Sequence, residues 1–162
     1  MKMDNPFQEQ IREGWKIYQN HLVAAIAPLT TDQLAFEISP DLRSIMTVAA
    51  HIVSARVWWF RFVMQEGSEE MEPMASWDDE GEPLRSAAEL VAGLETTWAI
   101  IESGLKRWTA ADMVEVFYRP GSDKTRSYTR QWIIWHVLEH DLHHGGELSF
   151  ALGAQGLPGI DL

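Results

Sequence analysis

Residues 136–148 read His136-Val-Leu-Glu-His140-Asp-Leu-His143-His144-Gly-Gly-Glu-Leu, and this stretch predicts both a helix and a site on it. Side chains four residues apart lie one turn apart on the same face of a helix. His140 and His144 have that spacing, and His136 continues it by one more turn. The run holds four of the six histidines of the chain. Two stacked imidazoles can hold one metal ion, so the run indicates half of a metal site whose remaining ligands come from elsewhere in the fold.

Four segments show apolar side chains at spacings of three and four residues, the pattern of amphipathic helices. They are expected at about Pro6–Ala27, Leu42–Met64, Ser86–Trp108 and Thr129–Gly153. Ser86-Ala-Ala-Glu89 forms a capping box at the start of the third segment. Together the segments predict an all-α fold, a four-helix bundle in a single domain over residues 1–162. Bundles commonly hold metal sites in the core between facing helices.

The connections between these helices are long. Residues 66–85 hold eight carboxylates and one arginine, and we expect them to be a solvated surface. Residues 113–128 alternate weakly and then reach Pro-Gly-Ser-Asp, which is compatible with a short hairpin. Long connections indicate that not all neighbouring helices in the bundle are joined by tight turns.

Composition excludes several classes of protein. The net charge of −11 and the lack of a basic patch argue against nucleic-acid binding. The cations nearest to such a patch are Lys124, Arg126 and Arg130, which we expect to be solvated. With no cysteine, the chain has no disulfide and no thiolate ligand of its own. Without a signal peptide or an apolar stretch long enough to span a membrane, a cytoplasmic protein is the expectation.

Only His21 and His51 lie outside the cluster and could complete a metal site. His51 shares the apolar face of the second helix with Val48 and Ile52. A polar ring on such a face must find a partner, either as a hydrogen-bonded core histidine or as a ligand beside His140 and His144. His51 lies about as far along its helix as His140 does along the fourth helix. The two could therefore meet whether these helices run parallel or antiparallel, and the sequence leaves the helix direction open.

Taken together, these residues resemble the DinB-like superfamily of small four-helix, metal-binding proteins, which includes bacillithiol transferases and mycothiol-dependent maleylpyruvate isomerase. The resemblance covers nearly the whole chain. Its carriers are Ser44 to Phe60 in the second helix, Trp135 to Leu148 in the fourth, and the closing Leu152-Gly-Ala-Gln-Gly-Leu-Pro158-Gly.

The resemblance implies a ligand set. In the family, one histidine of the second helix and two histidines of the fourth, four residues apart, bind a divalent metal. By position these are His51, His140 and His144. This chain has Gly145 where the family often has arginine or another polar residue, and Glu147 where it has glutamine. Both departures bear on the surroundings of the ligands and on substrate contacts, not on the ligands.

Three neutral imidazoles leave a metal ion its full charge and an open position, a form that suits catalysis better than a closed structural site. We expect Zn or Ni first, with Mn, Fe or Co as alternatives. Two reactions fit: transfer of a low-molecular-weight thiol, which must arrive as a cosubstrate, onto a small electrophile, or metal-assisted hydrolysis. Candidate bases for hydrolysis are Glu139, Asp141 and Glu147, each more typical of a surface residue or of a partner to a histidine. A catalytically silent binding module is the third alternative.

Other residues near the site carry weaker expectations. His136 and His143 are expected to be exposed or hydrogen-bonded to the site rather than ligands. Arg56 could meet an anionic substrate, but a salt bridge to the acidic surface is its expected role. Four tryptophans could wall a pocket and are more typical of core at their spacing: Trp58, Trp59, Trp132 and Trp135. The family and the eight tryptophans make a homodimer plausible.

Overall fold

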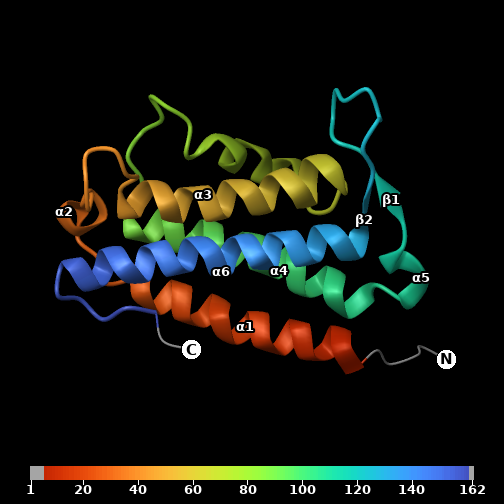
Figure 1. Ribbon diagram of the computed structural model, residues 1–162, viewed down its shortest axis with the longest axis horizontal. Coiled ribbons are helices and arrows are strands. Elements are labelled where there is room, and N and C mark those ends of the chain that lie inside the picture. Colours follow the sequence, from red (N-terminus) through yellow and green to blue (C-terminus); the bar gives the residue numbers. More distant parts are fainter. Residues whose placement is uncertain (1–5, 161–162) are drawn as a thin grey trace.

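The computed structural model describes residues 6–160, and four long helices form most of it (Figure 1). These helices are α1 (Pro6–Ile26), α3 (Ile45–Val57), α4 (Ala87–Arg107) and α6 (Arg130–Ala154). Helix α3 continues as a π-helix, η1 (Trp58–Val63). The predicted all-α bundle is confirmed. Residues 1–5 and 161–162 of the predicted single domain lie outside the described residues.

Short elements fill the connections. They are α2 (Thr31–Leu34), the 3-10 helix η2 (Glu69–Ser76), α5 (Ala110–Met113), and the strands β1 (Val116–Phe117) and β2 (Tyr128–Thr129). The two strands pair antiparallel, with Val116 opposite Thr129, so the predicted hairpin is present. Within the described residues, no helix combines the length and the apolarity that a membrane span requires.

Side-chain caps fix where the helices begin. Ser86 accepts a hydrogen bond from the backbone N–H of Glu89, and the Glu89 carboxylate accepts one from the backbone N–H of Ser86, which confirms the predicted capping box. Ser44 caps α3 through the N–H of Thr47, and Thr129 caps α6 through that of Trp132. Each such cap contributes about 1 kcal/mol. Two of the capped helices, α3 and α6, carry the histidines of interest.

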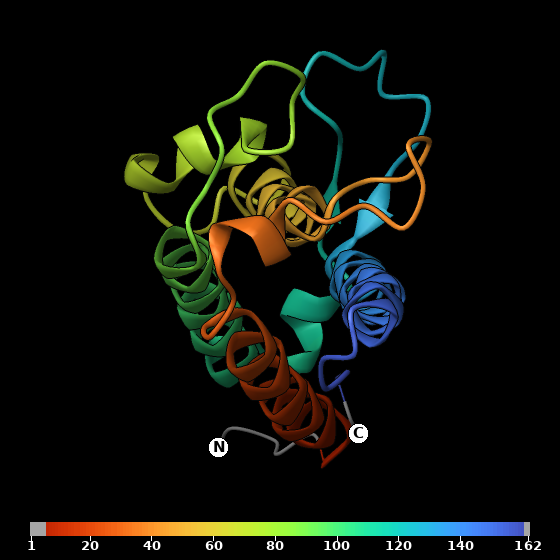
Figure 2. The same ribbon diagram turned by 90° about the vertical axis from the view of Figure 1, so that its left-hand side faces the viewer.

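The direction of the helices explains the long connections. In Figure 1, α3 and α4 run one way along the bundle while α1 and α6 run the other way, and Figure 2 shows the four helices end on. Since α3 and α4 are parallel neighbours, residues 64–86 must return along the whole bundle. The returning segment packs η2 against α3 and buries Met71. The antiparallel pairing of α3 with α6 settles the topology that the sequence left open.

The bundle contains two apolar cores. The first lies toward the α2 end and includes Leu22, Ile26, Ile45, Ile52, Leu94 and Leu148. The second lies toward the β-hairpin and includes Trp15, Phe60, Trp98, Ile101, Ile133 and Val137. On α6 the first core takes residues from Leu148 onward and the second takes residues up to Val137, so the two meet near residue 141.

A group of buried polar side chains fills the junction between the two cores, and we call it the polar layer: Gln19, Arg56, Thr97 and Asp141. The Arg56 guanidinium donates to Asp141 through Nη2 at 2.7 Å and through Nε at 3.0 Å. It also donates to Gln19 Oε1 at 2.8 Å and to Thr97 Oγ1 at 3.2 Å. Trp15 Nε1 donates to Asp141 at 2.7 Å. The layer therefore ties all four long helices together.

Three expectations about charged residues are wrong. Arg56 does not pair with the acidic surface, because it is 0% exposed and its partner is the equally buried Asp141. Arg130 is buried as well, where it pairs with Glu66 and Glu115. The connector 66–85 is not merely a solvated surface, because it packs on α3 and turns Asp78 toward His51. In each case the partner residue is distant along the chain and comes close only when the protein folds.

Candidate metal centre

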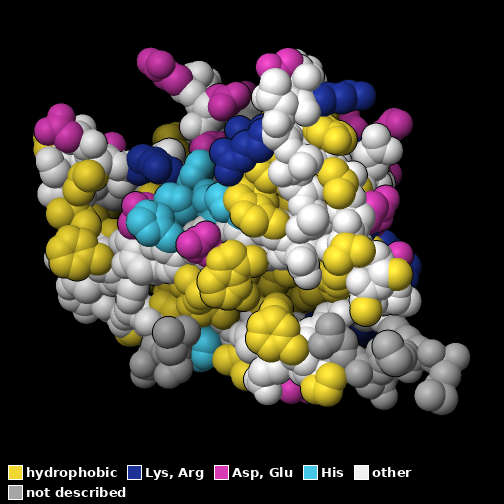
Figure 3. All heavy atoms as spheres, turned by 45° about the vertical axis from the view of Figure 1, so that its right-hand side comes forward, with side chains coloured by type: hydrophobic (Ala, Val, Ile, Leu, Met, Phe, Trp, Pro, Cys, Tyr) yellow, Lys and Arg dark blue, Asp and Glu magenta, His cyan; other side chains and the backbone are white. Residues whose placement is uncertain are grey.

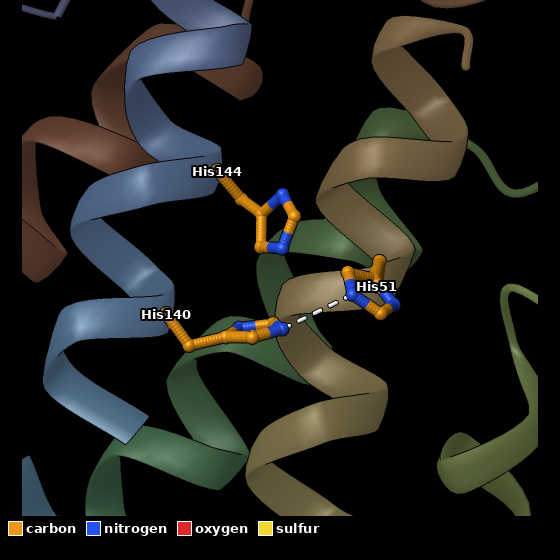
Figure 4. Close-up of side chains that lie close together, drawn as sticks. All are labelled: His51, His140 and His144. Carbon is orange, nitrogen blue, oxygen red and sulfur yellow. Dashed lines mark hydrogen bonds between the residues drawn. The ribbon is translucent and has the colours of Figure 1, made fainter. Parts of the chain in front are cut away.

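The structure brings His51 of α3 together with His140 and His144 of α6 (Figure 4). One ring nitrogen of each lies within 4.8 Å of the others. His140 Nε2 and His51 Nε2 are 3.0 Å apart, and the rings of His51 and His144 meet edge to face with centroids 4.6 Å apart. His140 and His144 share a face of α6 because they are one turn apart, and α3 presents His51 to that face.

Two carboxylates fix the orientation of two of these rings. His51 Nδ1 donates to Asp78 Oδ2 at 2.6 Å, and His144 Nδ1 donates to Glu147 Oε2 at 2.9 Å. An ionised carboxylate can only accept, so the ring proton of each histidine sits on Nδ1. In the neutral rings, the Nε2 atoms of His51 and His144 therefore carry a lone pair and no proton. Carboxylates bonded to histidines in this way are the usual outer partners of metal-ligating imidazoles.

His140 differs from the other two. Its Nδ1 is buried and has no hydrogen-bond partner among the described residues. Since His51 Nε2 can only accept, His140 Nε2 donates in their contact. No carboxylate fixes the proton of His140 on one nitrogen, so Nε2 can release it and present a third lone pair. Three imidazole nitrogens of borderline softness form a donor set that suits a divalent transition metal.

The surroundings favour the neutral form of two of these histidines, His140 and His144. Burial, together with repulsion from His144 and His51, lowers the pKa of His140 to about 3. Burial also lowers the pKa of His144, although Glu147 acts in the opposite direction. Burial is the largest single influence on the pKa of Asp78 and raises it, but the hydrogen bonds from His51 and Ser54 and the attraction of His51 together outweigh burial and hold the pKa of Asp78 below its ordinary value. The cluster therefore combines the neutral imidazoles of His140 and His144 with the ionised carboxylates of Asp78 and Glu147, and a neutral imidazole is the form that coordinates a metal.

Acidification is expected to destabilise the metal-free protein. His140 in the unfolded chain titrates near its ordinary pKa of 6.5, whereas its pKa in the folded state is about 3. Below about pH 6.5 the unfolded chain therefore binds a proton that the folded protein does not, and stability falls as the pH drops toward 3. Asp78 and Glu147, whose pKa values are lowered by folding, add a loss of the same sign at lower pH.

Denaturant midpoints of the chelator-treated protein, measured from neutral pH down to about pH 5, check this expectation. The His140→Gln variant cannot titrate at this position and should lose less stability over that range. An equal loss of stability in the wild type and the variant would show that His140 does not cause the acid sensitivity.

The other histidines lie outside the triad. His136 stacks on Trp132 with ring centroids 4.8 Å apart, and the side chain of His143 is 69% exposed. A second group of possible ligands, His143, His144 and Glu147, forms on the outer side of α6. Its Glu147 already accepts from His144, and His143 faces solvent, so this group is less suited to hold an ion. His21 belongs to neither group.

A cleft of about 340 Å³ opens beside the triad. Its lining is formed by His51, His136, His140, Ser54, Ala55, Trp58, Trp59, Ala75, Asp78, Asp79 and Arg119. Figure 3 shows the histidine side chains reaching the surface there. Of the four tryptophans expected in the core, Trp59 is buried, but Trp58 and Trp135 are 38% and 55% exposed. The core expectation is wrong for these two, and Trp58 instead forms part of the wall of the cleft.

Sequence reasoning did not find Asp78 or Arg119. Asp78 is 27 residues from its partner His51 in a connector rich in carboxylates, so no spacing singles it out. Arg119 follows β1, and its place beside α3 depends on how the hairpin folds back. The arrangement as a whole can bind a cation between α3 and α6 and admit a small molecule from one side.

Comparisons with known proteins agree with the fold. A family model for the DinB superfamily matches residues 15–148. A DinB-like protein from Bacillus cereus ATCC 10987 is similar in structure, with a TM-score of 0.71 at 19% identity, over 95% of this chain and 96% of that chain. A protein assigned to the DinB family from Exiguobacterium sibiricum 255-15 has a TM-score of 0.68 at 16% identity, over 94% and 93% of the two chains. A DinB-like protein from Bacillus subtilis gives 0.63 at 16% identity, over 94% and 96%. No curated protein matches the sequence.

Proposed function

This chain belongs to the DinB superfamily, and from that premise we propose that it binds one divalent transition-metal ion through His51, His140 and His144. We further propose that it transfers a low-molecular-weight thiol onto a small electrophile. The observation that carries the proposal is the convergence of the three imidazoles, two of them oriented by Asp78 and Glu147. Zn and Ni are the ions we expect first, with Mn, Fe and Co as alternatives.

An ion at this position would act as a Lewis acid and lower the pKa of a thiol that approaches it. The chain supplies the rest. Since it contains no cysteine, the sulfur has to come from a cosubstrate. His136 lines the cleft, and burial lowers its pKa, so its neutral ring can accept the thiol proton. The sulfur then bonds to carbon of the electrophile, and the proton passes from His136 to the atom that takes up the electron pair.

Hydrolysis is the alternative reaction, and the three carboxylates that the sequence offered as bases are poorly placed for it. A general base needs a free carboxylate near the attacked atom. Asp141 is bonded to Arg56 and Trp15 in the polar layer, and Glu147 accepts from His144. Glu139 is exposed and lies 3.9 Å from His136. If an ion binds but neither a thiol nor an ester reacts, the protein is a catalytically silent binding module.

Elemental analysis of tag-free protein tests the proposed centre. We expect about one equivalent of a transition metal per chain, and its loss in His51→Ala, His140→Ala and His144→Ala, because each removes one of three ligands. Circular dichroism must show that the variants are folded. His143→Ala is the matched control: it removes the neighbouring exposed histidine and should keep the metal. Wild type that stays metal-free after incubation with Zn, Ni and Mn salts would contradict the proposal.

The Asp78→Asn variant tests whether the carboxylate bonded to His51 contributes to the metal affinity. An asparagine keeps the shape but loses the charge that holds the Nδ1 proton of His51, so we expect metal affinity to fall roughly 10- to 100-fold. Competition with a chromophoric chelator measures the change. Asp79→Asn removes the adjacent exposed charge and has no bond to a histidine to lose, so its affinity should stay near that of wild type. Equal losses in the two variants would indicate a general charge effect instead.

Cytoplasmic location and a homodimer belong to the same proposal. The outward side of α6 carries Trp135, Leu142 and Phe150, which are 55%, 41% and 69% exposed. Large apolar side chains on one helix face support a contact with a second copy. Sedimentation analysis of wild type beside Phe150→Ser checks it.

A further inference from the structure

Two unpaired arginines of this acidic protein lie near the triad, Arg119 in the cleft and Arg43 in a separate hollow beside Glu147. Among the residues that the structure describes, most lysines and arginines form ion pairs with carboxylates. The exceptions within the described residues are Arg43, Arg119, Lys124 and Arg126. Figure 3 shows lysine and arginine side chains on both sides of the histidine cluster. In a chain of net charge −11, many carboxylates are available, so an arginine that lines a cleft without pairing with one of them points to an external anion.

Arg119 is the unpaired cation that lines the cleft beside His51, His136 and His140. Its guanidinium lies over the ring of Trp59 at 5.1 Å and over that of Tyr128 at 5.4 Å. Both rings belong to buried side chains, so they give the flexible arginine a fixed platform. A planar guanidinium held by its face keeps its N–H edges free, and those edges match the two oxygens of a carboxylate.

We propose that Arg119 binds the carboxylate of a small organic acid whose other end reaches the histidine triad. The link between this proposal and thiol transfer rests on the proposed function. The proposal adds the class of molecule that the cleft accepts, which is a substrate or a thiol that carries a carboxylate. Trp58 and Trp59 line the same cleft and give it an apolar surface suited to a short hydrocarbon segment. Arg43 lies on the other side of the triad, where it lines a separate hollow with Glu147.

Carboxylates in the same cleft restrict the positions at which the anion can bind. Asp78 and Asp79 line the wall formed by the connector 66–85. Asp78 already accepts a hydrogen bond from His51, whereas Asp79 is exposed. An incoming carboxylate is repelled from that wall and attracted to Arg119. Removing Asp79 should therefore tighten the binding of an anion.

Binding of 3-phenylpropionate to the metal-free protein tests the proposal apart from metal and thiol chemistry. Quenching of tryptophan fluorescence reports binding, since Trp58 and Trp59 line the cleft. The neutral control ligand is 3-phenylpropionamide, which has the same shape. One charge-assisted pair of hydrogen bonds predicts that wild type binds the acid about tenfold more tightly than the amide.

Variants assign the effect to one residue. Arg119→Gln should bind the acid no more tightly than the amide, with the affinity for the amide unchanged. Arg107→Gln removes an exposed arginine that pairs with Glu66 and does not line the cleft, so the preference for the acid should persist. A wild type without that preference, including one that binds neither compound, overturns the proposal. So does a preference that survives in Arg119→Gln or disappears only in Arg43→Gln.

A parallel titration of the cobalt-loaded protein separates this proposal from the proposed function. A charge-transfer band with 3-mercaptopropionate and with 2-mercaptoethanol reports a thiolate on the metal in both cases. Absence of the band with both thiols counts against thiol transfer, while the acid preference of the metal-free protein still decides the role of Arg119. Loss of the acid preference with a normal band counts against Arg119 alone.

Discussion

Replacing Asp141 with asparagine is expected to lower the free energy of unfolding by about 3–5 kcal/mol, the range measured when one partner of a buried ion pair is removed. Asp141 and Arg56 are both 0% exposed, so the variant leaves a guanidinium charge inside the bundle with no counter-charge. Gln19 and Thr97 supply only neutral acceptors for it. Urea denaturation followed by circular dichroism measures the loss.

A second variant separates lost charge balance from lost packing. Arg56→Met combined with Asp141→Leu removes both charges and keeps apolar volume, so it should be less destabilised than Asp141→Asn. It will not return fully to wild type, because Trp15 and Gln19 lose their partners. As a surface control, Glu82→Gln breaks an ion pair with Arg85 and should cost less than about 1 kcal/mol. A loss of that small size in Asp141→Asn would mean that the buried pair is not a stabilising element.

Two adjacent glycines of α6 are expected to respond in opposite directions to alanine. A Cβ on Gly145 would overlap the hydroxyl of Tyr18, which packs against α6 from α1. Because Tyr18 is buried in the first core, it cannot simply turn away. Overpacking of this kind costs about 1–3 kcal/mol. Gly145→Ala should therefore destabilise the protein, and the forced shift of α6 should also weaken metal binding at the neighbouring His144.

Gly146 provides the control for this prediction. No atom of the described structure lies within 4 Å of a Cβ built there, so Gly146→Ala should stabilise the helix by up to about 1 kcal/mol. Adding Tyr18→Phe to Gly145→Ala removes the overlapping hydroxyl and should recover part of the loss. If Gly145→Ala were as stable as Gly146→Ala, the close approach of α1 and α6 would be wrong. Thermal unfolding of the four proteins decides this.

The Tyr18 contact also explains a departure from the family pattern. The family often has arginine or another polar residue at the position of Gly145, and here a side chain at that position would meet Tyr18. The sequence alone shows the glycine but not its reason, since Tyr18 is far from it along the chain.

The features that the sequence predicted are those set by local chemistry. Helix bounds follow from apolar spacing and from caps such as Ser86, and the facing of His140 and His144 follows from helical geometry alone. The apolar face around His51 left two alternatives, a hydrogen-bonded core histidine or a ligand, and the family resemblance singled it out as a ligand. The approach of these side chains is seen in the structure, while binding of a metal there stays a proposal.

The features that the sequence did not predict depend on which residues meet after folding. Arg56 was expected to pair with the surface, because nothing local distinguishes a buried arginine whose partner, Asp141, is 85 residues away. Asp78 lies in a connector where every carboxylate looks alike until the chain folds back over α3. Helix direction was equally open, since apolar spacing does not say which end of α6 lies beside the start of α3.

The polar layer between the two apolar cores has a consequence for how the molecule opens. Each core could fluctuate as its own cooperative unit, with the layer as the boundary at which local unfolding stops. The triad lies beside that boundary, with His140 next to Asp141 and His51 a little over one turn before Arg56. A ligand that joins α3 to α6 there would couple the two units, because neither could open without releasing it. Amide hydrogen exchange would then slow at both ends of the bundle together, although the ligand touches neither end.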